Sequence, residues 1–185
     1  THDALDVQAL AEHVVVIIDG RVLQSGTPEQ VFRAPRTRQI ADLVGMNVCW
    51  SGTVMELEAG ADGWQATIKF PDCLLRVPVP PDRALRAEQR VEIALRTDEI
   101  SLLSTPKDAP AATLSTSNDA RVAATVVQEQ ARGAVFVITV CLSSQQRLDI
   151  PIPRWQRREL ELSPGASVTL SIPGEAIHLF SPQEY

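Results

Sequence analysis

The residues of this sequence whose types suit chemistry are few and widely spaced. Three histidines, His2, His13 and His178, lie far apart, and none has a second histidine or a cysteine at metal-ligand spacing. An imidazole can act as an acid, a base or a directional hydrogen-bond donor near neutral pH, but a lone histidine is more often structural. We interpret His13 and His178 as structural and predict no metal site, whereas the role of His2 depends on the motif around it.

The three cysteines are also isolated from one another. Cys49, Cys73 and Cys141 form no CxxC pair, and each alternates with apolar neighbours in a predicted strand. This pattern predicts reduced, mostly buried thiols in a cytosolic protein, without a metal or redox role.

The composition is that of an ordinary globular chain. The 185 residues are 44% hydrophobic, 22% charged and 4% aromatic, and the net charge of -6 provides no positive field for nucleic acid or anionic lipid. The longest apolar run, Val14 to Ile18, is much shorter than the roughly 20 residues of a membrane helix. The opening Thr1-His2-Asp3 lacks the features of a signal peptide, and we expect the N-terminus to be cut from a longer chain.

The first 45 residues predict a short α/β segment. Residues 4–12 have helical periodicity, with Leu5, Leu10 and Ala11 near one face, and the apolar run that follows predicts a strand. Asp19-Gly20 suits a two-residue hairpin turn, so the chain should return antiparallel over Arg21 to Gln24.

Two short helices should follow this hairpin. Thr27-Pro28-Glu29-Gln30 matches a capping box, and its helix should end near Arg33, before Pro35. Thr37 can cap a second helix with Ile40, Leu43 and Val44 on one face, stopped by Gly45.

After Gly45 the periodicity becomes alternating, and the remainder predicts β structure in two similar halves. Three blocks recur in the same order, at offsets of 72, 73 and 77 residues: Gly52–Glu58 with Ala124–Gln130, Leu75–Pro80 with Leu148–Pro153, and Arg90–Ser104 with Ser167–Ser181. The predicted domains are residues 1–45, a first repeat at 46–105, a linker at 106–118 and a second repeat at 119–183.

The predicted fold class is therefore mainly β: two tandem, small OB-like barrels of five strands each, preceded by a short α/β segment. A unit of about 60 residues buries little apolar surface alone, so the two repeats should pack together or dimerise. The aromatic residues Trp50, Trp64 and Phe136 should fill the cores, and we interpret Arg154–Arg158 as a solvated basic face with Trp155 tucked against the barrel.

The first 47 residues resemble the end of an ABC ATPase domain. Thr1-His2-Asp3 is similar to the switch-histidine motif, and residues 10–17 are similar to the helix and strand after it, although His13 replaces the more usual Arg. The longest resemblance is the run DGRVLQSGTPEQVF at residues 19–32, and residues 34–47 are similar to the lead into an accessory domain.

This resemblance implies that His2 contacts the γ-phosphate of ATP and helps to couple two nucleotide-binding subunits. The sequence lacks a GxxxxGK[ST] loop, an LSGGQ-like signature and an apolar strand ending in Asp-Glu. We therefore expect no cofactor and no enzymatic activity in this chain itself, whereas ATP and Mg²⁺ would bind to the parent protein, an ABC-type ATPase.

Residues 46–183 resemble the transport-associated OB-like (TOBE) repeats of bacterial ABC importers for molybdate, sulfate, ferric iron, polyamines and sugars. The resemblance implies homodimerisation through the repeats, regulation of the ATPase and a cytoplasmic location, held peripherally on the inner membrane face by the permease subunits. We favour an oxyanion such as molybdate as the transported solute.

In oxyanion importers such repeats can bind the anion itself, through hydroxyls, backbone N–H groups and a basic side chain. The candidate ligands are Asn47, Ser51, Ser117, Asn118 and Arg121, although we favour the alternative that these are ordinary turn residues. Two other functions stay open: a free-standing oxyanion-binding module, and an OB-type binder of single-stranded nucleic acid, which the charge and the few aromatics disfavour.

Overall fold

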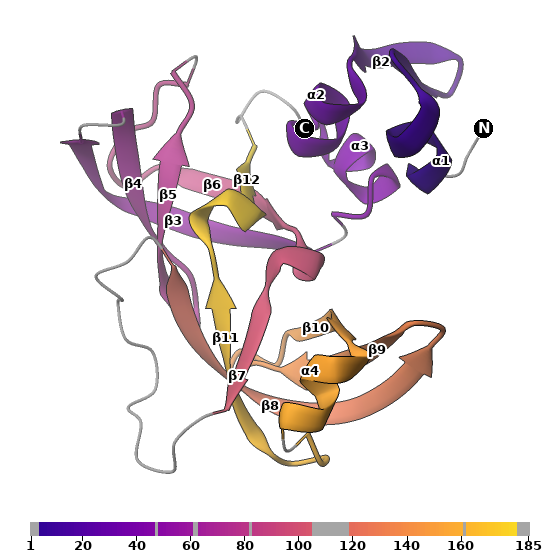
Figure 1. The fold of residues 1–185 in the computed structure, drawn as a ribbon. Coiled ribbons are helices and arrows are strands. Elements are labelled where there is room, and N and C mark those ends of the chain that lie inside the picture. The colour runs from indigo at the N-terminus through magenta and orange to yellow at the C-terminus, as the bar shows by residue number, and fades with distance from the viewer. Residues whose placement is uncertain are drawn as a thin grey trace.

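The computed structural model describes residues 4–46, 48–60, 63–81, 83–104, 119–160 and 162–180. They form an N-terminal α/β unit followed by two β repeats (Figure 1). Within these ranges, no helix combines the length and the apolar character required to span a membrane.

The α/β unit contains three helices and one hairpin. Its elements are α1 (Ala4–Leu10), β1 (Val14–Ile18), β2 (Arg21–Gly26), α2 (Pro28–Arg33) and α3 (Arg38–Leu43). Asp19 and Gly20 have φ values of 50° and 75°, and β1 pairs antiparallel with β2, which confirms the predicted turn. The unit has a small core of its own around Val16, Val31 and Ile40.

The capping box predicted for α2 is present. The Gln30 amide donates to the Thr27 hydroxyl at 3.3 Å, and the Gln30 side-chain oxygen accepts from the Thr27 amide at 3.0 Å. Thr37 caps α3 as predicted, but Leu43 is 56% exposed and Ala41 is buried in its place. Leu10, expected on an apolar helix face, is 80% exposed, and none of the α1 side chains that the structure describes belongs to the unit's core.

A buried glutamine joins β2 to the segment after α2. The Gln24 side chain donates to the Ala34 carbonyl at 3.0 Å and accepts from the Arg36 amide at 2.9 Å. Two backbone groups of the segment after α2 thereby gain hydrogen-bond partners.

The two repeats consist of the same elements in the same order. The first contains β3 (Val48–Gly60), β4 (Gly63–Lys69), β5 (Leu74–Val79), β6 (Arg90–Leu95), the 3-10 helix η1 (Thr97–Glu99) and β7 (Ser101–Ser104). The second contains β8 (Ala120–Arg132), β9 (Val135–Cys141), β10 (Arg147–Pro153), the additional helix α4 (Arg154–Glu159), β11 (Ser167–Ile172), η2 (Gly174–Ala176) and β12 (Ile177–Leu179).

The correspondence between the repeats extends to irregularities of the backbone. β3 has a register shift between Val54 and Glu56, and β8 has one at the equivalent place, between Val126 and Gln128. Bulges of this kind bend a strand, and here they lie in the two longest strands. The duplication predicted from the three sequence blocks is therefore also a duplication of structure.

The repeats exchange their last strands. One five-stranded sheet has the order β12-β6-β3-β4-β5 and the other β10-β9-β8-β11-β7, so β7 completes the sheet of the second repeat and β12 that of the first. Figure 1 shows β7 running into the sheet of β8 and β11, while β12 lies beside β6. Neither sheet is complete without a strand from the other repeat.

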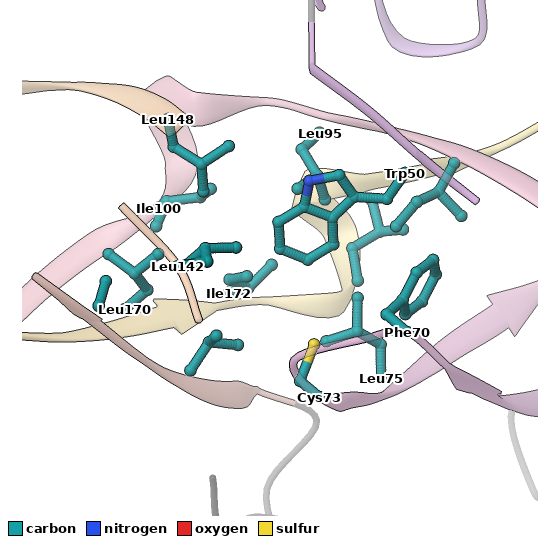
Figure 2. Close-up of a cluster of buried hydrophobic side chains, with 14 of the residues drawn as sticks. Trp50, Phe70, Cys73, Leu75, Leu95, Ile100, Leu142, Leu148, Leu170 and Ile172 are labelled. Atoms are coloured by element: carbon teal, nitrogen blue, oxygen red, sulfur yellow. The ribbon is translucent and has the colours of Figure 1, made fainter. Parts of the chain in front are cut away.

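One hydrophobic core spans both repeats. Figure 2 shows Trp50, Phe70 and Leu75 of the first repeat facing the same interior as Leu142, Leu148 and Leu170 of the second. All six side chains are at most 3% exposed. The expectation that two small units pack together is confirmed.

Two aromatic residues lie differently from their predicted positions. Trp64 is 57% exposed because it lies near the tip of the β3–β4 hairpin, beyond the core that buries Ala66 and Ile68. Trp155 is 65% exposed on α4, a helix that the β periodicity did not predict. The prediction that these two tryptophans pack in or against the barrels is therefore wrong, whereas Trp50 is buried as expected.

Candidate functional site

Most of the predicted site residues lie outside the described part of the chain. These are His2, the expected γ-phosphate contact, and the candidate anion ligands Asn47, Ser117 and Asn118. Their roles stay predictions.

The other two candidate ligands, Ser51 and Arg121, lie on different five-stranded sheets. Ser51 is exposed on β3, where its hydroxyl donates to a carboxylate oxygen of Glu92 at 3.3 Å. Arg121 is exposed on β8 and opposite Ser171 of β11. The Ser51 hydroxyl is therefore engaged with a negatively charged partner, which is an unfavourable neighbour for an anion.

A groove of about 400 Å³ lies where the repeats meet. It is lined by residues of β4 and β5, by the start of the second repeat and by η2: Gln65, Arg76, Pro78, Asp119, Pro173, Gly174 and Glu175. Of the predicted anion ligands that the structure describes, neither Ser51 nor Arg121 lines it. The proximity of these segments follows from the strand exchange, which brings η2 next to β5, and no sequence periodicity indicates it.

The charges of this groove are mixed. The Arg76 guanidinium is ion-paired with Glu58, and the Asp119 carboxylate accepts from the Ser171 hydroxyl at 3.5 Å. Glu175 adds a second carboxylate. Among the described lining residues the one guanidinium already has a partner, so these residues do not provide the converging donors that an oxyanion requires.

Arg96 joins three parts of the molecule at the strand crossover. Its amide donates to the Ala176 carbonyl of the second repeat at 2.9 Å, and its guanidinium donates to the Phe32 carbonyl of α2 at 3.0 Å. The same guanidinium lies 3.5 Å from a carboxylate oxygen of Glu99. Its side chain is only 12% exposed, so these bonds form largely away from water.

The α/β unit docks on the outer face of the first sheet, and we call this contact the joint. Its apolar part consists of Ala41 and Met46 on one side and Ala94 and Phe180 on the other, with Val44 and Cys49 at its margin. Ala94 lies between Cys49 of β3 and His178 of β12. The joint therefore depends on β12, the strand that the second repeat donates.

His178 is a half-buried polar residue of the joint. Its ring stacks edge-to-face on Phe180, with the ring centroids 5.1 Å apart. Burial, together with the positive charges of Arg83 and Arg96, lowers its pKa from 6.5 to about 4, although an interaction with the Pro35 backbone opposes the shift. The imidazole is therefore neutral near pH 7, as expected for a structural histidine.

All three cysteines are free thiols, as predicted. Cys73 is buried in the shared core, and Cys49 and Cys141 are half-buried. Desolvation raises the pKa of Cys73 to about 12 and also raises that of Cys49. Within the described ranges, no three histidine, cysteine or acidic side chains gather in a way that could hold a metal ion.

The fold and the joint define a class of protein: a strand-exchanged pair of OB-like barrels on which an α/β unit is docked. Residues 93–180 match the family described as "TOBE domain". The match begins within β6 and ends after β12, so it includes the whole strand exchange.

Curated relatives extend the match toward the N-terminus. The "Spermidine/putrescine import ATP-binding protein PotA" of Borrelia garinii is 31% identical over 104 residues, 56% of this chain and 26% of the relative. The "Fe(3+) ions import ATP-binding protein FbpC 2" of Pectobacterium atrosepticum is 29% identical over 182 residues, 98% of this chain and 45% of the relative. Residues 93–180 are thus similar to TOBE domains, and the chain as a whole is similar to ATP-binding subunits of bacterial ABC importers.

A solved structure shares the fold. It is the cytoplasmic molybdate-binding protein ModG with molybdate bound, with a TM-score of 0.62 and 20% identity, covering 73% of this chain and 96% of ModG. This confirms the predicted OB-like fold class. The chain spans only about a quarter to just under half of the length of the curated relatives that it matches.

Proposed function

We propose that this chain is the C-terminal regulatory and dimerisation region of the ATP-binding subunit of a bacterial importer. The observation that carries the proposal is the match over 182 residues with an import ATP-binding protein. A match of that length includes nearly all of the α/β unit as well as both repeats. The joint supports the same proposal, because it gives the unit a direct contact with the repeats.

In the intact subunit, ATP and Mg²⁺ would bind to a preceding nucleotide-binding domain, and His2 would contact the γ-phosphate. An imidazole offers a directional donor close to the charge that develops on the transferred phosphate. This chain alone would be neither an ATPase nor a nucleotide-binding protein. The α/β unit would be the last part of the nucleotide-binding domain, and the repeats would adjust that domain through the joint.

The proposed partners are a second copy of the chain, contacted through the repeats, and the transmembrane permease subunits of the importer. The permease would hold the subunit on the cytoplasmic face of the membrane. Nucleic acid is not proposed as a partner, because the net charge of -6 opposes contact with phosphate backbones.

Truncation of the intact subunit tests this proposal. Removing everything after Gly45 should retain ATP hydrolysis but weaken dimerisation, as measured by hydrolysis rates and by light scattering on the same samples. A matched His2→Ala variant of the intact subunit should dimerise normally and lose hydrolysis. If truncation left dimerisation unchanged, the repeats would not have the proposed pairing role.

A second candidate function is oxyanion binding, whether in an importer for an oxyanion such as molybdate or in a free-standing module. The fold shared with molybdate-bound ModG favours it, and the engaged hydroxyl of Ser51 disfavours it. Calorimetric titration with molybdate, tungstate and sulfate tests it, with Arg121→Met as the matched variant. Heat of binding that the variant loses would support the anion site, and absence of heat from all three anions would exclude it.

A further inference from the structure

Three buried polar atoms without partners lie in or next to the joint. They are Nε2 of His178, Nη1 of Arg83 and Oε2 of Glu92. Glu92 lies next to the end of β12, since its carbonyl accepts from the Phe180 amide at 2.9 Å. Unpaired buried groups are uncommon and costly, so this face of the first sheet is held together at an energetic cost.

The charges around His178 make the joint sensitive to any further positive charge. Arg83, from the segment before β6, and Arg96, from the segment after β6, both act on the imidazole. Arg96 is already engaged with Glu99 and with the Phe32 carbonyl. No ion pair to Arg83 is found within the described ranges.

Two carboxylates lie near the joint: Glu92 of β6, which has one oxygen engaged by Ser51 and the other buried without a partner, and Asp42 of α3, which acts on Cys49. Neither is among the groups that act on the imidazole of His178. Arg76, the charged residue of β5, is paired with Glu58. On the side of the α/β unit, the ring meets the backbone of Pro35, which precedes Arg36. An imidazolium at this position would therefore be the third cation in a partly desolvated contact.

We propose that the joint is a charge-gated contact: the α/β unit stays docked on the first repeat only while position 178 is uncharged, and a positive charge there releases the unit without unfolding the barrels. The unit has a core of its own, so release does not require it to unfold. The barrels are held by the core shared between the repeats, which is separate from the joint. The inference does not depend on the proposed function, because all the contacts lie within this chain.

Two native cysteines report on this release. Cys49 lies at the margin of the joint and should become accessible when the unit leaves, whereas Cys73 is buried in the barrel core and reports on barrel unfolding. The experiment measures the alkylation rate of each thiol by mass spectrometry in the full chain near neutral pH. His178→Lys introduces a permanent positive charge, and His178→Met is the uncharged control of similar size.

The proposal predicts that Cys49 reacts at least about tenfold faster in His178→Lys than in His178→Met, since a charge in a desolvated contact costs more than about 1.4 kcal/mol. Cys73 should react equally slowly in both variants. Equal Cys49 rates in the two variants would overturn the proposal. A rise of both the Cys49 and the Cys73 rate in His178→Lys would also overturn it, because the charge would then unfold the barrel itself.

Acidification of the parent chain provides a second test that needs no charged variant. At each pH the alkylation rate of Cys49 in the parent chain is divided by its rate in His178→Met. This division cancels the thiolate fraction, because the same thiol is compared. This ratio should rise as the pH is lowered while the Cys73 ratio stays constant. A constant Cys49 ratio down to the onset of barrel unfolding would contradict the gating.

Discussion

Glu88 and Gly165 occupy the same left-handed turn position in the two repeats. Their φ values are 65° and 88°, and their amides donate to the carbonyls of Val54 and Val126, each at 2.8 Å. The turn before β6 and the turn before β11 thus have one backbone geometry, but only the second has the residue that adopts it without strain.

Replacing Glu88 with Gly should therefore stabilise the protein, by up to about 1 kcal/mol, because a residue with a Cβ is strained at positive φ. The free energy of unfolding in urea measures this. Ala87→Gly, one position earlier and outside the left-handed region, is the control and should destabilise. A loss of stability in Glu88→Gly would show that the turn does not constrain the chain as described.

Gly52 should not tolerate a side chain, although its counterpart in the second repeat is Ala124. A Cβ at Gly52 would lie 2.7 Å from side-chain atoms of both Ile68 and Phe70, which are buried. Gly52→Ala should cost about 1–3 kcal/mol by overpacking, whereas Ala124→Gly should cost about 0.5–1 kcal/mol through chain entropy. Thermal unfolding of the two variants compares the costs, and an equal effect would contradict the close approach at Gly52.

Asp72 connects the β4–β5 turn of the first repeat to the β9–β10 turn of the second. Its carboxylate accepts from the Ser143 hydroxyl at 2.7 Å and from the Ser144 amide at 2.6 Å. Asp72→Ala should lower the free energy of unfolding by about 1–3 kcal/mol, because it leaves the half-buried amide unpaired. Ser143→Ala removes one bond of an exposed hydroxyl and should cost less. The reverse order of the two losses would contradict this account of the turn contact.

The stability of the chain should fall with acidification through His178. Its pKa is about 4 in the folded chain and 6.5 ordinarily, so between these values the unfolded chain binds the proton and the folded chain does not. Protonation of His178 therefore does not lower the free energy of unfolding above pH 6.5. As the pH falls from 6.5 toward 4, it lowers the free energy of unfolding by up to about 3 kcal/mol. Urea unfolding at a series of pH values should show a shallower decrease in His178→Gln than in the parent chain. The exposed control His13→Gln should follow the parent.

The parts of the fold that local chemistry determines were predictable from the sequence. The Asp19-Gly20 turn and the Thr27 capping box each depend on neighbouring residues and occur as predicted. The duplicated β unit was visible because the two halves keep the same order of apolar blocks.

The strand exchange was not predictable, because alternation along β7 or β12 indicates a strand but not its partner. The groove and the joint depend on that exchange, so Arg96, Glu175 and the position of His178 within a charged contact were missed. The exposure of Trp64 was missed for a related reason: periodicity does not show where a hairpin extends beyond the core.

The proposal that the repeats pair two subunits is tested most directly by sedimentation equilibrium of this chain over a range of concentrations. The account predicts a reversible approach to twice the chain mass of 20.2 kDa as the concentration rises. A mass of 20.2 kDa at every concentration would contradict it.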